Sequence, residues 1–239
     1  MSHSDVELIS PFGRIRLAPP TPQEDEAVSI LRSDPISRKY LRFMPEQISV
    51  ADVAARRELR AKDPHILDLY AYVVNEDGSS PFVGLSGVFN IDEVNRSCEA
   101  GILVSPELHG KGIATEILYT LLKYVFEKRK FHRTTFETGV DNVNMGGWLQ
   151  NVAGARLEAE RKECWKEGDG QYTDVHSYAI LEWEWADRIK ARLEERIRAR
   201  ASPWALTGIR VLRQYHTDFP RNAGKCWVVR ANLMYTFDA

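Results

Sequence analysis

The amino-acid sequence predicts an α/β domain of the mixed α+β kind, with a mixed, mostly antiparallel sheet flanked by helices and a C-terminal helical extension. Three strand-like stretches follow one another between residues 66 and 104, which indicates an antiparallel meander. A long amphipathic stretch then separates them from further strands, as a crossover helix does in a mixed sheet. We expect the domain over residues 10–185, a helix over 186–200 and a tail of unknown structure over 201–239.

The first elements are marked by their boundaries. Residues 13–17 alternate polar and apolar side chains and stop at Pro19-Pro20, which predicts a short strand. Helices are predicted over 21–31, which opens with Thr-Pro and acidic residues, and over 50–61, which follows a serine. The strands of the meander are predicted over 66–74, 82–89 and 98–104, with a turn at 75–80.

The apolar spacing changes to a helical period after Pro106. Apolar residues recur every third or fourth position, which predicts a helix over 112–128. The remaining elements of the domain are predicted as a strand over 134–138, a short helix over 144–152, and a hairpin of 156–165 with 173–184. Apolar residues at every fourth position over 185–200 predict a final helix that either docks on the domain or a second subunit, or lies in solvent.

Composition excludes several classes of protein. The 239 residues carry a net charge of −2, with 44% hydrophobic and 28% charged residues, as soluble globular proteins do. This balance gives no basis for a nucleic-acid partner. No apolar run approaches the roughly 20 residues of a membrane span, and the first residues lack the pattern of a secretion signal. We therefore expect a cytoplasmic protein with no membrane partner, either a monomer or a homodimer.

The cysteines and histidines indicate neither disulfides nor a metal. Cys98, Cys164 and Cys226 are odd in number and widely spaced, so we expect three buried small hydrophobic side chains rather than a disulfide framework or a zinc site. None of the six histidines pairs with a cysteine or carboxylate at metal-ligand spacing, and no metal is predicted.

The most informative segment joins the strand that ends near Val104 to the following helix. Its loop carries Gly110 and Gly112, which let a backbone approach an anion because they have no Cβ. The first turn of a helix leaves about four N–H groups without intrahelical partners and carries the positive end of the helix dipole. Lys111 adds a positive charge. Residues 109–114 are therefore a candidate diphosphate cradle, although a tight turn would also account for the glycines.

Several ordered motifs resemble the GNAT superfamily of acetyl-coenzyme-A-dependent N-acetyltransferases. Residues 109–114, His-Gly-Lys-Gly-Ile-Ala, are similar to the family's Gln/Arg-x-x-Gly-x-Gly/Ala pattern between a strand and a long helix. Residues 98–104, 154–159 and 172–183 resemble segments of the RimJ/RimL-type branch, which acetylates the N-termini of ribosomal proteins. The resemblance covers about residues 12–184, and it implies a GNAT-like sheet.

The resemblance implies direct acetyl transfer from acetyl-coenzyme A to a primary amine, without a covalent enzyme intermediate. The residues that it assigns to the coenzyme are Ile102, Leu103, Val104, His109, Gly110, Lys111, Gly112, Ile113, Ala114 and one of Asn142 and Asn144. Two departures stand out. The family usually has Gln or Arg where His109 stands, so the side-chain contribution there should be weaker or pH-dependent. Both asparagines lie one residue from the family's register, and Gly146-Gly147-Trp148 replaces its usual Ala/Ser-containing turn.

Acetyl transfer to an amine calls for a base, because an alkyl ammonium group has a pKa of about 10 and an α-amine of about 8. The family often has a glutamate where Glu99 stands, so Glu99 is the candidate base; the alternative is a solvated carboxylate at the sheet's rim. Tyr178 is a candidate proton donor to the sulfur, or a packed side chain of the sheet. Asp174, His176 and Ser177 do not form a triad, since adjacent strand residues point to opposite faces.

Three functions stay open from the sequence: acetylation of a small-molecule amine, acetylation of a protein or peptide N-terminus, and an acyl-coenzyme-A-binding regulator without turnover. An open, acid-lined groove would favour peptides, and a closed aromatic pocket would favour small amines. A Glu99 that points away from the site would favour the regulator. Four aromatic residues either line such an acceptor pocket or pack in the core: Tyr40, Phe43, Tyr70 and Tyr72. Trp148 is expected to pack rather than to bind substrate.

Overall fold

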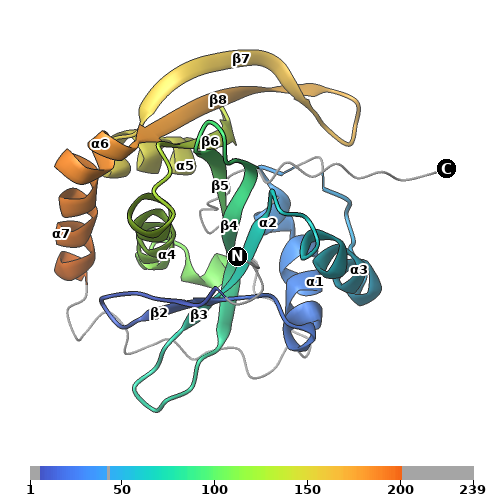
Figure 1. Cartoon of the computed structure of the whole chain (residues 1–239). Helices are drawn as coiled ribbons and strands as arrows, with labels where there is room; N and C mark the ends of the chain where they lie inside the picture. The colour runs from blue at the N-terminus through green and yellow to red at the C-terminus, as the bar shows by residue number, and fades with distance from the viewer. Residues whose placement is uncertain (1–5, 42–43, 201–239) are drawn as a thin grey trace.

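The computed structural model describes residues 6–41 and 44–200. In this part of the chain, eight strands form one sheet in the order β1-β2-β3-β4-β5-β6-β8-β7 (Figure 1). The strands are β1 (Leu8–Ile9), β2 (Ile15–Ala18), β3 (Leu67–Val73), β4 (Phe82–Asp92), β5 (Ser97–Val104), β6 (Arg133–Gly139), β7 (Arg156–Lys166) and β8 (Tyr172–Leu181). Neighbouring strands are antiparallel except β5 and β6, which are parallel, so the mixed, mostly antiparallel sheet predicted from the sequence is confirmed.

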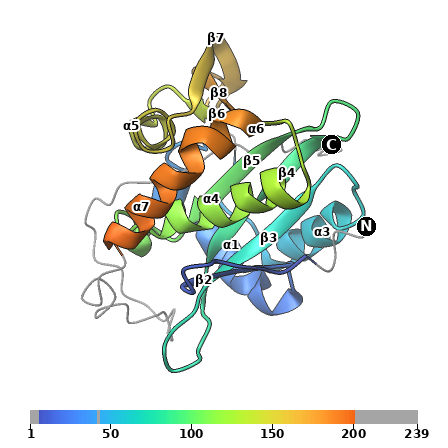
Figure 2. The ribbon, with the colours of Figure 1, turned by 60° about the vertical axis from the view of Figure 1, so that its left-hand side comes forward.

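Helices cover both faces of this sheet. They are α1 (Asp25–Ser33), α2 (Pro35–Arg38), α3 (Val50–Arg60), α4 (Ile113–Lys123), α5 (Val143–Gly147), α6 (Glu182–Glu184) and α7 (Lys190–Arg200), with helical continuations over Tyr124–Lys128, Trp148–Ala153 and Trp185–Ile189. Figures 1 and 2 show α4 and α7 on one face of the central strands and α1 and α3 on the other. Among the described residues, no helix is long and apolar enough to cross a membrane.

Two hydrophobic clusters fill the two faces, and strand alternation decides which side chains enter each. On β5, Ala100 and Ile102 join the large cluster beneath α4, whereas Leu103 joins the smaller cluster beneath α1 and α3. Because alternate residues of a strand share a face, Glu99 and Gly101 lie on the same side as Leu103. The candidate base therefore faces the α1 and α3 side of the sheet.

The parallel contact between β5 and β6 is short. Its register covers three residue pairs, from Ser97 opposite Arg133 to Glu99 opposite Thr135. Further along, β5 remains paired with β4 as far as Val104. From Ala100 onward, the edge of β5 that faces away from β4 therefore has backbone N–H and C=O groups that do not pair with β6. This is the edge that leads to the glycine turn.

The final helix begins earlier than predicted. The strand expected to reach residue 184 ends at Leu181, because the carboxylate of Glu184 accepts a hydrogen bond from the Leu181 N–H at 3.1 Å and starts α6. The apolar stripe packs on the domain itself, where its members are buried in the core beside α4: Trp185, Ile189, Leu193 and Ile197. Two short elements, β1 and α2, have no counterpart in the sequence prediction.

The cysteines differ in their surroundings. Cys98 is buried, as expected, and burial raises the pKa of its thiol to about 12, so it stays protonated. Cys164 is only half-buried, which departs from the expectation because β7 is an edge strand of the sheet. Cys226 lies outside the described residues.

A buried ion pair fastens the N-terminal strands to α4. Glu116 is 0% exposed, and its carboxylate accepts hydrogen bonds from Ser10 Oγ at 2.6 Å and Arg14 Nε at 2.7 Å. Arg14→Ala should lower the free energy of unfolding by about 3–5 kcal/mol, because it leaves a buried carboxylate without its cation. Urea unfolding measures this loss. Glu7→Ala is the matched control, since its ion pair with Arg16 is exposed and contributes about 1 kcal/mol or less; equal losses in both variants would contradict the prediction.

Candidate active site

The glycine turn presents an open set of backbone amides. Gly110 and Gly112 have φ of +78° and +82°, and Gly112 is the residue immediately before α4. A Cβ placed on Gly110 would meet nothing within 4 Å, and one on Gly112 would meet only the Arg200 side chain. The Glu116 N–H donates to Gly112 O at 3.3 Å, so the amides of Ile113 and Ala114 precede the first hydrogen bond of the helix. An anion can approach these amides without moving any core side chain.

The His109 side chain bonds to the last residue of β5. Its Nε2–H donates to the Val104 carbonyl at 2.9 Å, and its Nδ1 is buried without a partner among the described residues. Burial lowers the pKa of His109, only partly offset by the bond to Val104, so the ring is neutral at pH 7. His109 therefore brings no positive charge to an anion bound at the turn. It can contribute only through the backbone conformation of the turn.

Two cations lie at the turn, and the sequence analysis singled out only one of them. Lys111 is exposed. The other is Arg200, the last residue of α7, and its Nη1 lies 3.5 Å from Gly110 O. Figure 2 shows both ends of α7. Arg196, one turn earlier on the same helix, has a buried Nε without a partner in this part of the chain, and burial together with Arg200 and Arg192 lowers its pKa. In the sequence, the only sign that cations gather on this side of α7 is the four-residue spacing of Arg192, Arg196 and Arg200.

Glu99 is buried at the base of the free edge of β5. It is 6% exposed, and its Oε2 accepts a hydrogen bond from Asn90 Nδ2 at 3.0 Å. Asn90 has φ of +51° where the β4–β5 register is irregular, and this bulge accompanies the contact between the two side chains. Glu99 is thus no solvated rim carboxylate. The backbone of Ile102 to Val104 continues from it along the free edge toward the turn.

The two asparagines after β6 differ in accessibility. Asn142 is buried, and its Oδ1 accepts the Met145 N–H at 3.2 Å at the start of α5. Asn144 is half-buried and remains partly accessible. Trp148 packs in the core, as expected, and its Nε1–H donates to Thr115 Oγ1 at 3.1 Å. Asn144 is therefore the better placed of the two to meet a ligand.

Tyr178 lies on the opposite face of the sheet from Glu99. It is 1% exposed in the cluster beneath α4, and burial raises the pKa of its hydroxyl. Its oxygen lies 3.4 Å from His176 Nδ1, and a Cβ on Gly146 would lie 3.3 Å from it. His176 Nε2 in turn lies 3.2 Å from Glu160, so no triad with Asp174 and Ser177 forms. The structure brings the Tyr178 hydroxyl close to Gly146 of α5 and not to the Glu99 side.

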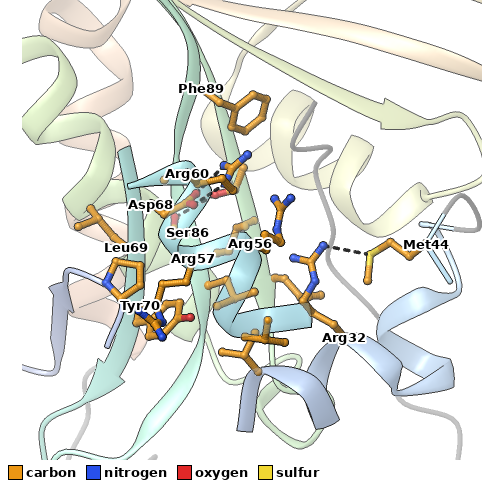
Figure 3. Close-up of a pocket in the computed structure, with 18 of the residues that line it drawn as sticks. Arg32, Met44, Arg56, Arg57, Arg60, Asp68, Leu69, Tyr70, Ser86 and Phe89 are labelled. Carbon is orange, nitrogen blue, oxygen red and sulfur yellow. Dashed lines mark hydrogen bonds and ion pairs between the residues drawn. The ribbon is translucent and has the colours of Figure 1, made fainter. Parts of the chain in front are cut away.

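A hollow of about 800 Å³, open in part to solvent, lies between α1, α3 and the Glu99 face of the sheet (Figure 3). Its inner end is lined by Gly101, Ile102 and Leu103 of β5. Of the aromatic residues expected at an acceptor pocket, Tyr70 lines it, while Tyr40 and Tyr72 pack in the adjoining cluster and Phe43 lies outside the described residues. The sequence analysis missed the rest of its lining, which includes Phe89 and four arginines.

The chain is similar to known acetyltransferases. A family model described as an acetyltransferase (GNAT) domain matches residues 14–152, more than half of the chain. YdaF of Bacillus subtilis (strain 168), named as a candidate ribosomal N-acetyltransferase, is 27% identical over 171 residues, which cover 72% of this chain and 92% of YdaF. A spermidine N(1)-acetyltransferase of Vibrio cholerae serotype O1 is 32% identical over 115 residues, which cover 48% of this chain and 65% of that protein.

A solved structure shows the same fold. The crystal structure of spermidine N-acetyltransferase from Vibrio cholerae in complex with CoA and spermine matches with a TM-score of 0.65 at 20% identity, covering 73% of this chain and 99% of that chain. The family match includes the strand that carries Glu99, the glycine turn and α4. These are the elements that the motifs in the sequence singled out, and the chain belongs to the GNAT family of acetyltransferases.

Proposed function

We propose that this protein transfers the acetyl group of acetyl-coenzyme A directly to a small primary amine that enters the hollow beneath α1 and α3. The observation that carries this proposal is the free edge of β5, which runs from the buried Glu99 to the open amides of the glycine turn. A pyrophosphate at the turn and a thioester beside Ile102 would lie along one strand. The family uses acetyl-coenzyme A, and this arrangement fits it.

Each part of the site has a chemical task in this proposal. The amides of Gly112, Ile113 and Ala114, with Lys111 and Arg200, bind the diphosphate. Backbone N–H groups of Ile102 to Val104 stabilise the oxyanion that develops on the thioester carbonyl. Glu99, directly or through a water molecule, takes the proton that the amine loses as its nitrogen bonds to the carbonyl carbon. The carbon–sulfur bond breaks, and the sulfur leaves as a thiolate that takes up a proton.

The hollow favours a small acceptor over a peptide. Tyr70 and Phe89 line it, and Asp68 is the one carboxylate among its described lining residues, so it is not the acid-lined groove that would favour basic peptides. The position of Glu99 on the same face argues against a regulator without turnover.

Thiol release tests the proposal. With acetyl-coenzyme A present, a panel of small primary amines and of peptides with free N-termini should give release of coenzyme A above background for small amines, with little or none for peptides. Calorimetry on the same samples should show coenzyme A binding. Binding without thiol release from any acceptor would indicate the regulator, and absence of binding would remove the turn from the coenzyme site.

A further inference from the structure

The helix α7 lies outside the residues that the family model matches. The match covers residues 14–152, whereas α7 covers Lys190–Arg200. The helix nevertheless packs beside α4, and the Tyr119 hydroxyl of α4 donates a hydrogen bond to Glu194 at 2.7 Å (Figure 2). Its last residue, Arg200, lies at the glycine turn. This chain therefore has side chains at the turn that the matched segment does not supply.

Three arginines form a row along one face of α7. Arg192, Arg196 and Arg200 stand at every fourth position, so they lie on the same side of the helix and span about 12 Å along its axis. At one end, Arg192 Nη2 donates to Asn151 O at 2.5 Å, in the helical continuation after α5. At the other end, Arg200 Nη1 lies 3.5 Å from Gly110 O. This arginine row therefore runs from that continuation to the glycine turn, with Arg196 between its ends.

Carboxylates balance other arginines of this helix but not the arginine row. Arg198 pairs with Glu194, and Arg188, just before α7, pairs with Glu184. Within residues 6–41 and 44–200, no carboxylate forms an ion pair with a member of the row; the two outer members contact backbone carbonyls instead. The row is thus a local excess of positive charge beside the glycine turn.

Arg196 is the member of the row whose position packing explains least. Its Nε is buried and has no hydrogen-bond partner in the described part of the chain. Burial, followed by the charges of Arg200 and Arg192, lowers the pKa of Arg196, although the guanidinium group still stays charged at pH 7. Holding a partly buried cation beside two others costs free energy, and that cost falls when an anion lies against them. The row therefore favours an anionic ligand.

The chemistry of coenzyme A brings a third phosphate to this side of the turn. In the proposed function the pantetheine arm runs from the turn along β5, so the adenosine at the other end of the diphosphate leaves the turn away from β5. The ribose of this adenosine carries a phosphate at its 3′ position. The arginine row also starts at the turn, and α7 carries it over α4 and the continuation after α5. Successive members of the row are about 6 Å apart along the axis, a step comparable with the ribose that separates the two phosphate groups.

We infer that Arg196, beside Arg200, binds the 3′-phosphate of coenzyme A, so that α7 selects this coenzyme over its dephosphorylated form. The inference rests on the proposed function, because it takes the glycine turn to bind the diphosphate. A guanidinium group binds a phosphate through paired, charge-assisted hydrogen bonds. Arg200 and Lys111 serve the diphosphate, and Arg196 is the cation one helical turn farther from it.

Calorimetry with coenzyme A and with 3′-dephospho-coenzyme A tests this preference. The two molecules differ only in the 3′-phosphate, so contacts with the diphosphate and the pantetheine arm are the same for both. The wild type should bind coenzyme A at least about tenfold more tightly, as expected from one charge-assisted hydrogen bond. Equal affinities for the two molecules would overturn the inference.

Two substitutions assign the preference to Arg196. Arg196 is half-buried, so Arg196→Gln and Arg196→Met should both fold, which thermal unfolding checks. Each should bind coenzyme A about tenfold or more weakly and leave the affinity for 3′-dephospho-coenzyme A unchanged. Arg198→Gln is the matched control, since Arg198 lies on the same helix but pairs with Glu194, and it should keep the preference. A variant of Arg196 that keeps the wild-type preference, or that weakens both coenzymes equally, would overturn the assignment.

A measurement without any acceptor separates this inference from the proposed function. Adenosine 3′,5′-bisphosphate should raise the temperature of unfolding more than adenosine 5′-monophosphate does, in the wild type and not in Arg196→Gln. Preference for the 3′-phosphate without thiol release from any amine would support the role of Arg196 while the proposed transfer fails. Thiol release with the same KM for acetyl-coenzyme A and for its 3′-dephospho form would overturn that role while the transfer stands. Absence of coenzyme A binding would overturn both.

Discussion

Glu99→Gln is expected to lower kcat by about 10²- to 10⁴-fold, the contribution of a positioned general base. Glutamine has nearly the shape of glutamate and can still accept the hydrogen bond from Asn90, but it takes up no proton at neutral pH. The fold and the affinity for coenzyme A should therefore stay close to those of the wild type. Steady-state thiol release, with calorimetric affinity and thermal unfolding of the same samples, measures all three.

The control for this variant is Glu93→Gln. Glu93 lies in the turn between β4 and β5, is largely exposed and pairs with Arg129, so its loss should leave kcat unchanged. The pH profile adds a second readout. In both enzymes the rate should fall toward acid because the amine becomes protonated. In the wild type, protonation of Glu99 should lower the rate further, and this second loss should be absent from Glu99→Gln. Wild-type rates for Glu99→Gln over about pH 6 to 9 would remove Glu99 from the mechanism.

Gly112→Trp is expected to weaken coenzyme A binding by at least about 100-fold. The indole would fill the space in which a diphosphate approaches the amides of Ile113 and Ala114. Loss of two charge-assisted hydrogen bonds, at about 1.5–3 kcal/mol each, gives an effect of this size. Lys111→Glu should also abolish measurable binding, because it replaces an exposed cation at the turn by an anion. Titration calorimetry with coenzyme A measures both affinities.

Backbone strain is the competing explanation for Gly112→Trp, and Gly170→Trp controls for it. Gly170 has φ of +87°, close to the +82° of Gly112, and a Cβ there would meet nothing within 4 Å. Both substitutions therefore carry the same backbone strain, about 1–2 kcal/mol. Gly112→Trp must in addition displace the Arg200 side chain, which would lie 3.3 Å from a Cβ at Gly112. Only the variant at the turn should lose coenzyme affinity. Unchanged affinity in both Gly112→Trp and Lys111→Glu would refute the diphosphate assignment.

Most of the fold could be predicted from local pattern. The helical period after Pro106 gives α4, and the alternation between residues 66 and 104 gives the meander, because long periodic segments carry a strong signal. The misses have local causes. β1 has two residues and α2 has four, too few for any period. The start of α6 depends on a hydrogen bond from the backbone of Leu181 to Glu184, and the strand pattern gave no sign of it.

The site could be predicted only where its chemistry lies within one segment. The glycine turn is contiguous, so its amides, its cation and its helix could be inferred together from residues 109–114. The hollow draws on α1, α3 and three strands. From sequence alone Arg57 and Arg60 are ordinary surface residues of a helix, and their carboxylate partners lie 32 and 8 positions away. Arg200 comes from 90 residues beyond the turn that it contacts. Such contacts depend on tertiary structure.

The brief contact between β5 and β6 bears on the durability of this domain as well as on its chemistry. Only three residue pairs join β5 to β6. The strands that precede α4 are therefore held weakly to those that follow it within the sheet, and packing of the helices must help to keep them together. A coenzyme bound along this edge of β5 would make hydrogen bonds with the backbone groups that do not pair with β6. Because a ligand that binds only the native state shifts the unfolding equilibrium by mass action, bound coenzyme would also raise the stability of the domain.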